Sequence, residues 1–469
     1  MRKLLSLALL VAAAAILAAS CGGVSGPPEP KMIEGGGIGS GKISGNLFVY
    51  VIDEETRAVM SSATVRVGES SDPSPCEVVT DSTGLAKFQA DNCAGLKGPV
   101  TMTITASGYA PVTWIGVNGT NVTVPIRNSN PPPVATATVS GTISGFGSLP
   151  VPALHHQTLA LIAASQSDTL GDRANDLPQG TRNVPVGDQL FPIPSNLCVL
   201  NQAANDCNWT LTTRTGKQAH VALIVDQFDN NTPDLDTDDT FTLTGLAIKT
   251  GLDFTKDQIA TGETLTMLTD ADMQTFTASF ASLPSGMDYM GGFPALELGE
   301  EGRIAFILPA LDMTHTTSRV PKLSGALAGA HYSLIAQAQD AENQDRPSSL
   351  GWVHDANVGS TVALSSWLAP PSNILVNGGT YSFSKVADAT VQGAEIQNIE
   401  GKRVWSITVF DGTTSFTLPG LSPDPLPVGS LTFEVSALRI PGTDVNNFKL
   451  DDVRGNIAAI AKDFVAFTH

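Results

Sequence analysis

Residues 226–239, DQFDNNTPDLDTDD, bring together the residue types that bind a hard cation. Calcium takes about six to eight oxygen ligands from flexible loops, and carboxylates at alternate positions are typical of such loops. The predicted calcium ligands are Asp229, Asp234, Asp236 and Asp238. Two positions depart from the usual loop: Asp239 replaces the turn-forming glycine, and Gly245 replaces the closing glutamate. A solvated acidic loop between two strands remains the alternative. Calcium is the one cofactor that the sequence suggests.

The cysteines after the N-terminal region form two local pairs, Cys76 with Cys93 and Cys198 with Cys207. An even number of cysteines in an exported chain favours disulfides. Other connectivities remain open, because spacing alone does not decide between them. Neither pair has the CxxC spacing or a neighbouring histidine that a redox or metal site would need, so we expect structural disulfides.

The first cysteine, Cys21, follows a different pattern. Arg2 and Lys3 precede an apolar run over 4–17 and the small residues of 18–20, which together make a secretory signal. The run is shorter than the roughly 20 residues that span a bilayer. Residues 17–21, LAASC, resemble a bacterial lipobox, with Ala18 where that motif usually has leucine. The resemblance implies lipidation of Cys21. The residue after it is Gly22 rather than an aspartate, which resembles the lipoproteins that are sent to the outer membrane. An ordinary signal peptide with an unrelated cysteine is the alternative.

Tryptophans near strand ends could stack on sugar rings. Trp209, close to Cys207, and Trp352 are the candidates for such a binding platform, with a buried core position as the favoured alternative for each. Trp405 lies inside an alternating strand and is expected in a core. The chain contains no HExxH, GxSxG, phosphate-loop or dinucleotide motif, so no catalytic residues are predicted.

Composition limits the fold and the partners. The 469 residues contain 45 acidic and 26 basic side chains, a formal net charge of −19. This charge argues against nucleic acid and anionic lipid surfaces as partners, since both attract positive patches. Many glycines, threonines, valines and prolines, with short alternating apolar runs, predict an all-β fold of tandem β-sandwiches.

Turn-rich breaks divide the chain into a series of segments. We predict a signal peptide (1–20), a flexible Gly/Ser/Pro tether (21–41), a first sandwich (42–127), a Pro-rich linker (128–134), a second sandwich (135–268), a third β domain (269–370) and a C-terminal sandwich (371–469).

The first sandwich carries a recognisable order of turn and core residues. These are Gly45, Asp53, Ala63, Val65, Thr80, Asp81, Gly84, Phe88 and Ser107-Gly108-Tyr109. Their order resembles the carboxypeptidase regulatory-like domain, which implies a transthyretin-like sandwich that serves as a spacer or interaction module without catalytic residues. The C-terminal segment resembles a fibronectin type III-like sandwich, through Trp405 and the following FTLPGL.

These features predict a non-enzymatic lipoprotein of the outer membrane, attached to the membrane through its lipid anchor. We expect it to act as a binding, adhesion or envelope-structural module, with a polysaccharide or an envelope protein as partner and no nucleic acid. The alternative is a secreted hydrolase, or a hydrolase accessory subunit, that acts on polysaccharide or peptide. A cleft with two carboxylates or a His–Asp pair would favour that alternative.

Overall fold

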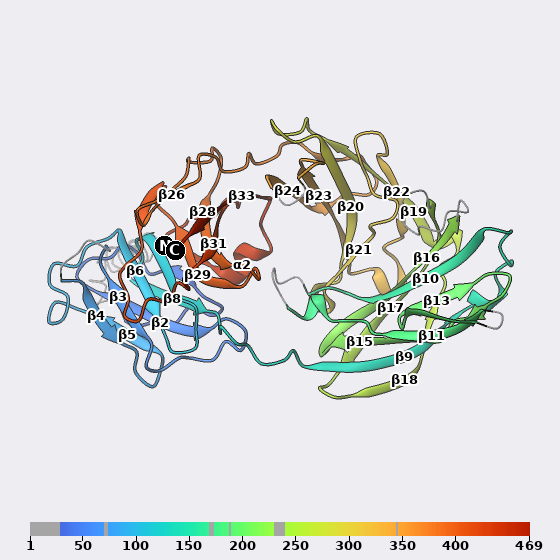
Figure 1. Cartoon of the computed structure of the whole chain (residues 1–469), viewed down its shortest axis with the longest axis horizontal. Helices are drawn as coiled ribbons and strands as arrows, with labels where there is room; N and C mark the ends of the chain where they lie inside the picture. Colours follow the sequence, from blue (N-terminus) through green and yellow to red (C-terminus); the bar gives the residue numbers. More distant parts are fainter. Residues whose placement is uncertain (1–28, 70–73, 168–172, 187–188, 229–239, 344–345) are drawn as a thin grey trace, which may run out of the picture.

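The computed structural model describes residues 29–69, 74–167, 173–186, 189–228, 240–343 and 346–469. Its described part is almost entirely β-strand, with one α-helix and a few 3-10 turns, which confirms the all-β prediction. Figure 1 shows two lobes: an end lobe, built from 29–127 and 371–469, and a middle lobe, built from 135–370. No described helix has the length and apolar character needed to cross a membrane.

The end lobe contains strands from both ends of the chain. Its first group is β1 (Gly37–Gly39), β2 (Leu47–Asp53), β3 (Thr64–Val67), β4 (Cys76–Val79), β5 (Leu85–Phe88), β6 (Val100–Thr105), β7 (Val112–Val117) and β8 (Asn121–Ile126). Its second group is β26 (Leu375–Asn377), β27 (Thr380–Ser382), β28 (Val391–Asn398), β29 (Arg403–Val409), β30 (Ser415–Thr417), β31 (Ser430–Arg439), β32 (Phe448–Lys449), α2 (Leu450–Arg454) and β33 (Ala459–Thr468).

The middle lobe contains the remaining strands. Its first group is β9 (Thr136–Ser144), β10 (His156–Ala164), β11 (Thr181–Val186), β12 (Gln189–Pro194), β13 (Leu197–Leu200), β14 (Asn205–Asp206), β15 (Trp209–Arg214), β16 (Gly216–Phe228), β17 (Thr240–Phe254) and β18 (Ile259–Thr266). Its second group is β19 (Met273–Phe280), β20 (Tyr289–Glu297), β21 (Arg303–Ala305), β22 (Thr317–Pro321), β23 (His331–Gln339), β24 (Ser348–Ala356) and β25 (Val362–Leu364).

These groups form four sandwiches, because each pairs two sheets around an apolar core. Three of the sandwiches share one twelve-stranded sheet, in the order β21-β20-β23-β24-β33-β31-β28-β29-β7-β6-β3-β4. The second sandwich instead packs against the third, since Val221 and Leu246 join the core around Phe276 and Tyr332. Shared sheets and cores therefore cross the segment boundaries expected from the sequence.

Turns in the first sandwich are held by residues that the sequence singled out. The Asp53 carboxylate accepts hydrogen bonds from the backbone N–H groups of Glu55 and Thr56, at 3.0 and 2.7 Å, and from the Tyr109 hydroxyl at 2.8 Å. Burial alone would raise the pKa of Asp53, but these hydrogen bonds outweigh burial and lower it. Thr80 similarly donates to the Met60 carbonyl at 2.7 Å.

The flexible tether predicted for 21–41 is wrong for its second half. Gly37 and Ile38 pair antiparallel with β8 on one side and with β32 on the other, so β1 lies inside a five-stranded sheet. Upstream of it, Lys31 and Ile33 donate backbone hydrogen bonds to side chains of β8, both at 2.8 Å. Strand β1 therefore connects the first and last parts of the chain.

Crowding around β1 explains why this segment is rich in glycine. A Cβ on Gly35 would lie 2.0 Å from the Asp451 carboxylate, and one on Gly37 would lie 2.2 Å from the Phe448 carbonyl oxygen. Gly37 also has a φ of 145°, a conformation that side chains disfavour. A composition that usually indicates flexibility is here required by close backbone packing.

The core of the second sandwich contains a titratable group, His220. Its ring stacks on Phe254 with centroids 5.6 Å apart and meets Trp209 edge-on. Burial lowers the pKa of His220 to about 4; among the smaller effects, the Glu263 carboxylate raises the pKa and the Lys249 ammonium group lowers it. The folded protein therefore holds this imidazole neutral where the unfolded chain would protonate it.

The crowding around β1 makes a prediction about stability. Gly37→Ala should lower the free energy of unfolding by about 2 kcal/mol or more, since the new methyl group meets backbone atoms as well as an unfavourable φ. The control is Gly41→Ala, because Gly41 has a φ of 73° but open space around it, and should cost about 1 kcal/mol. Denaturant unfolding of both variants measures the difference. Equal losses would mean that β1 is not tightly packed.

The neutral state of His220 makes a prediction about pH. Because its folded pKa is below the unfolded value of 6.5, its contribution is intact above pH 6.5 and is lost as the pH falls towards 4. The loss amounts to about 3 kcal/mol, from roughly 1.4 kcal/mol for each pKa unit. His220→Phe should remove this part of the acid sensitivity in urea unfolding between pH 7 and 4. Parallel pH profiles for the variant and the wild type would contradict the assignment.

Candidate functional site

The end lobe is joined by a seam between β7 and β29, which are about three hundred residues apart in sequence but pair parallel. Ser406 lies opposite Val112, and Val409 lies opposite Ile115. The buried Trp405 indole N–H donates to the Thr113 hydroxyl at 3.0 Å. Thr113 also shares a 2.9 Å hydrogen bond with the Thr103 hydroxyl. The seam is thus a continuous part of the twelve-stranded sheet.

Successive side chains on a strand point to opposite faces of its sheet, so the seam has two different faces. Trp114 of β7 borders a cleft on one face, whereas Thr113 and Ile115 border a cleft on the other. Each cleft lies where the N-terminal and C-terminal sandwiches meet, and each takes residues from both.

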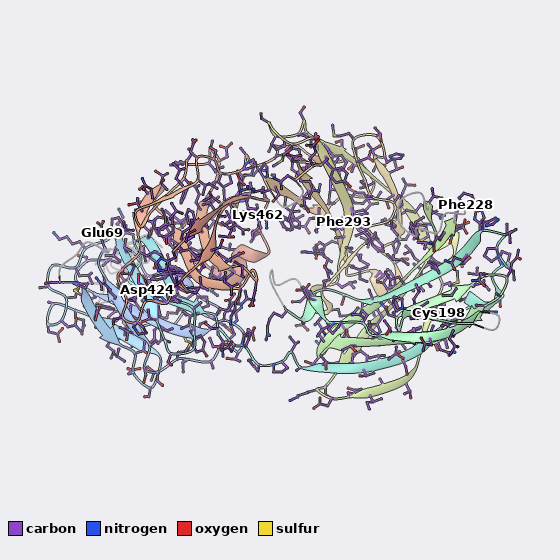
Figure 2. The ribbon with its side chains drawn as sticks, viewed as in Figure 1. Glu69, Cys198, Phe228, Phe293, Asp424 and Lys462 are labelled. Carbon is purple, nitrogen blue, oxygen red and sulfur yellow. A yellow bond between two sulfur atoms is a disulfide. The ribbon has the colours of Figure 1, made fainter. Side chains whose placement is uncertain are left out.

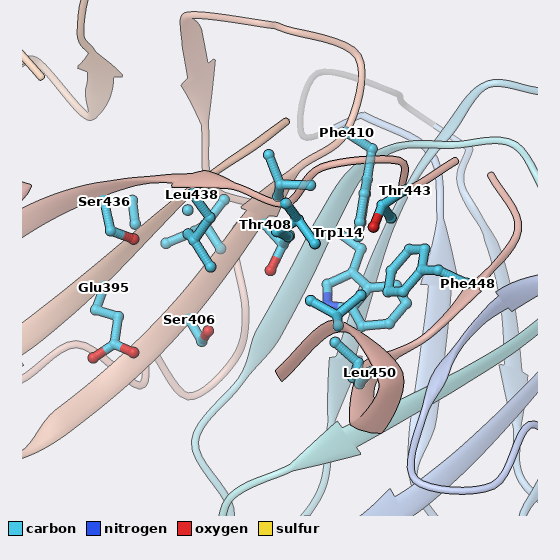
Figure 3. A pocket seen from close by; sticks show the side chains of 16 residues that line it. Trp114, Glu395, Ser406, Thr408, Phe410, Ser436, Leu438, Thr443, Phe448 and Leu450 are labelled. Carbon is cyan, nitrogen blue, oxygen red and sulfur yellow. The ribbon is translucent and has the colours of Figure 1, made fainter. Parts of the chain in front are cut away.

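The first, apolar cleft has a volume of about 210 Å³. Figure 3 shows Trp114, Phe448 and Leu450 at one end, and Glu395 and Ser436 at the other. The rings of Trp114 and Phe410 meet edge-on, with centroids 5.3 Å apart. Small-molecule sites typically occupy about 300–1,000 Å³. The apolar cleft is smaller than that range, so we interpret it as part of the packing between the sandwiches.

The second cleft, here called the hydroxyl cleft, has a volume of about 620 Å³, inside the range of small-molecule sites. Its polar lining includes Glu69, Thr101, Thr380, Asp411, Thr413 and Ser415. Two of these are carboxylates and four are hydroxyls, and the exposed Pro99 adds apolar surface. Figure 2 places Glu69 in the end lobe, far from Cys198 of the middle lobe. Such a surface can both donate hydrogen bonds to an uncharged polar ligand and accept them from it.

Several predicted site residues lie outside the described residues. They are Cys21, the expected lipidation site, and the expected calcium ligands Asp229, Asp234, Asp236 and Asp238. Lipidation and calcium binding therefore stay predictions. Within the described ranges, no group of three or more His, Cys, Asp and Glu side chains is arranged to hold a metal ion.

Both predicted disulfides are confirmed. Cys76 is bonded to Cys93, at a sequence separation of 17 residues, and Cys198 is bonded to Cys207, at a separation of 9. Each cross-link closes a short loop and restricts the unfolded chain there, which is the structural role expected of them.

The predicted sugar platforms are wrong. The side chains of Trp209 and Trp352 are only 1 % and 8 % exposed, so neither presents a ring face to solvent. Trp209 packs in the core of the second sandwich, because the alternation of β15 points it inward. The expectation that Trp405 is a core residue is confirmed, at 1 % exposed.

Four His–Asp pairs occur among the described residues, but none lies in either seam cleft. They are His156 with Asp226, His315 with Asp312, His331 with Asp355, and His469 with Asp424. Hydrogen bonds from Thr314 and His315 hold the pKa of Asp312 well below its usual range, as expected for a solvent-exposed turn.

Sequence reasoning missed both clefts. Glu69 and Asp411 are far apart in the chain and belong to no motif. The only local signal was the alternation in β7 and β29, which predicts strands but not that they pair with each other.

No protein-family model and no curated protein matches the chain. Among solved structures, the Bacillus anthracis TIE protein has 10 % identity and a TM-score of 0.14, over 69 % of this chain and 50 % of that chain. This chain therefore matches about half the length of that structure. The shaft pilin SpaA of Lactobacillus rhamnosus GG has 10 % identity and a TM-score of 0.14, over 48 % of this chain and 99 % of that chain. Two B repeats of the Staphylococcus aureus collagen-binding protein have 11 % identity and a TM-score of 0.12, over 86 % of this chain and 97 % of that chain. Similarity this weak carries no argument about fold or function.

Proposed function

We propose that the protein is a lipid-anchored, non-enzymatic binding module of the bacterial outer membrane, attached through Cys21. The observation that carries the proposal is the position of β1. Gly37 stands 16 residues after Cys21 and is paired on both sides within the end lobe. At about 3.4 Å per residue, the segment between them reaches at most about 50–55 Å. A lipid on Cys21 would therefore hold the folded body close to the membrane.

The binding role is supported by the hydroxyl cleft. Its volume suits a small ligand or one or two units of a polymer, and it lies in the end lobe, which also contains β1. The strongly acidic composition disfavours nucleic acid and anionic surfaces as partners. A polysaccharide or an envelope protein remains the partner that this chemistry favours.

A hydrolase is the second candidate, because Glu69 and Asp411 line one cleft. Glycoside hydrolysis needs one carboxyl group kept protonated by a desolvated environment and a second one kept ionised. Both side chains are solvent-exposed, so the cleft lacks the buried surroundings that would separate their roles. This exposure favours binding over hydrolysis.

The anchor can be tested directly in cells. Wild-type protein should incorporate a palmitate analogue and sediment with membranes, whereas Cys21→Ser should lose the label and leave the membrane fraction, since its acyl attachment point is gone. The matched control is Cys198→Ala with Cys207→Ala, which removes two cysteines but should keep the label. Labelling of Cys21→Ser, or unlabelled and soluble wild-type protein, would contradict the proposal.

A further inference from the structure

We propose that the hydroxyl cleft binds a neutral saccharide unit, either a hexose or an N-acetylhexosamine. The inference rests on the proposed binding function and assigns it a site and a ligand class. The proposed sugar site is therefore at the seam between the two ends of the chain, and not at Trp209 or Trp352, which are buried.

The position of Asp411 in the cleft depends on the glycine opposite it. Gly116 of β7 has a φ of 80°, and a Cβ there would lie 2.5 Å from the Cβ of Asp411. Only glycine at this position therefore allows the turn after β29 to pack this closely against β7. One carboxylate oxygen of Asp411 accepts the Thr413 backbone N–H at 3.0 Å, which orients the group. The second oxygen can accept a hydrogen bond from a ligand hydroxyl.

The charge around the cleft favours a neutral ligand. Glu69 and Asp411 repel anions, and the whole chain carries a formal charge of −19. Lys385 lies beside the same turn, since a Cβ on Gly412 would be 3.2 Å from its ammonium nitrogen. The turn that carries Asp411 therefore also has a positive charge beside it.

The remaining lining matches the two kinds of surface on a sugar ring. Thr101, Thr380 and Ser415 offer hydroxyls, which donate to sugar oxygens or accept from sugar hydroxyls. Phe416, whose ring stacks on Tyr381 with centroids 5.8 Å apart, packs in the core of the C-terminal sandwich, whereas the exposed Pro99 offers apolar surface against which the C–H face of a sugar can pack. The volume of about 620 Å³ has room for such a unit and for ordered water.

The test is calorimetric titration of the full mature chain with maltotriose, with triacetylchitotriose and, as an anionic probe, with trigalacturonate. At least one neutral probe should bind and trigalacturonate should not. Asp411→Asn and Thr101→Val should each weaken binding about tenfold, which corresponds to the loss of one hydrogen bond to the ligand. The matched control is Ser436→Ala, which changes the apolar cleft on the opposite face and should leave affinity unchanged.

Three results would overturn the inference. The first is that neither neutral probe binds. The second is that Ser436→Ala weakens binding while Asp411→Asn and Thr101→Val do not. The third is that the probe is hydrolysed, which would favour the hydrolase as the function of the cleft. Melting temperatures of all variants separate loss of binding from loss of folding. Because membrane attachment is measured independently through Cys21, failure here leaves the anchor proposal standing, and failure of the anchor leaves this site standing.

Discussion

Backbone pairing of β1 with β8 and β32 is the interaction on which the end lobe depends. Three residues close the sheet that joins the start of the described chain to its last sandwich. The pairing is reinforced by Arg57, which donates to the Gly35 carbonyl at 2.8 Å and forms an ion pair with Asp451 at 3.0 Å. The middle lobe is formed by the part of the chain between these two joined ends. Strand β33 of the end lobe pairs with β24 of the middle lobe (Figure 1).

The seam between β7 and β29 follows from that closure, and the clefts follow from the seam. Once the first and last sandwiches lie side by side, Phe410 joins the core of the first one, and Arg403 forms ion pairs with Glu395 of its own sandwich and with Glu54 of the other. Strand alternation then gives the seam an apolar face and a hydroxyl-lined face. A ligand in the hydroxyl cleft would touch both sandwiches, so its binding would stabilise their association by mass action.

Local patterns predicted much of the fold. Alternation located the strand that holds Trp405 and placed that residue correctly in a core, and the expectation of local cysteine pairs was correct for both disulfides. Prediction failed where composition has two physical meanings: a run of glycines can be a flexible tether, or it can be a folded segment in which positions such as Gly35 and Gly37 have no room for a side chain. It also failed where pairing is non-local, because nothing in β7 specifies β29 as its neighbour. The inward direction of Trp209 and Trp352 was misjudged, since nearness to a strand end does not decide which face a residue occupies.

Residues 29–41 belong to the folded body rather than to a tether. The most direct measurement compares thermal unfolding of the chain 29–469 with that of the chain 42–469, which lacks β1 but keeps every other described strand. We expect a clearly lower melting temperature for the shorter chain, because β8 and β32 lose their common partner and the cavity left by Ile38 is not refilled. Identical melting temperatures would mean that β1 contributes nothing to the stability of the fold and that residues 29–41 act only as a tether.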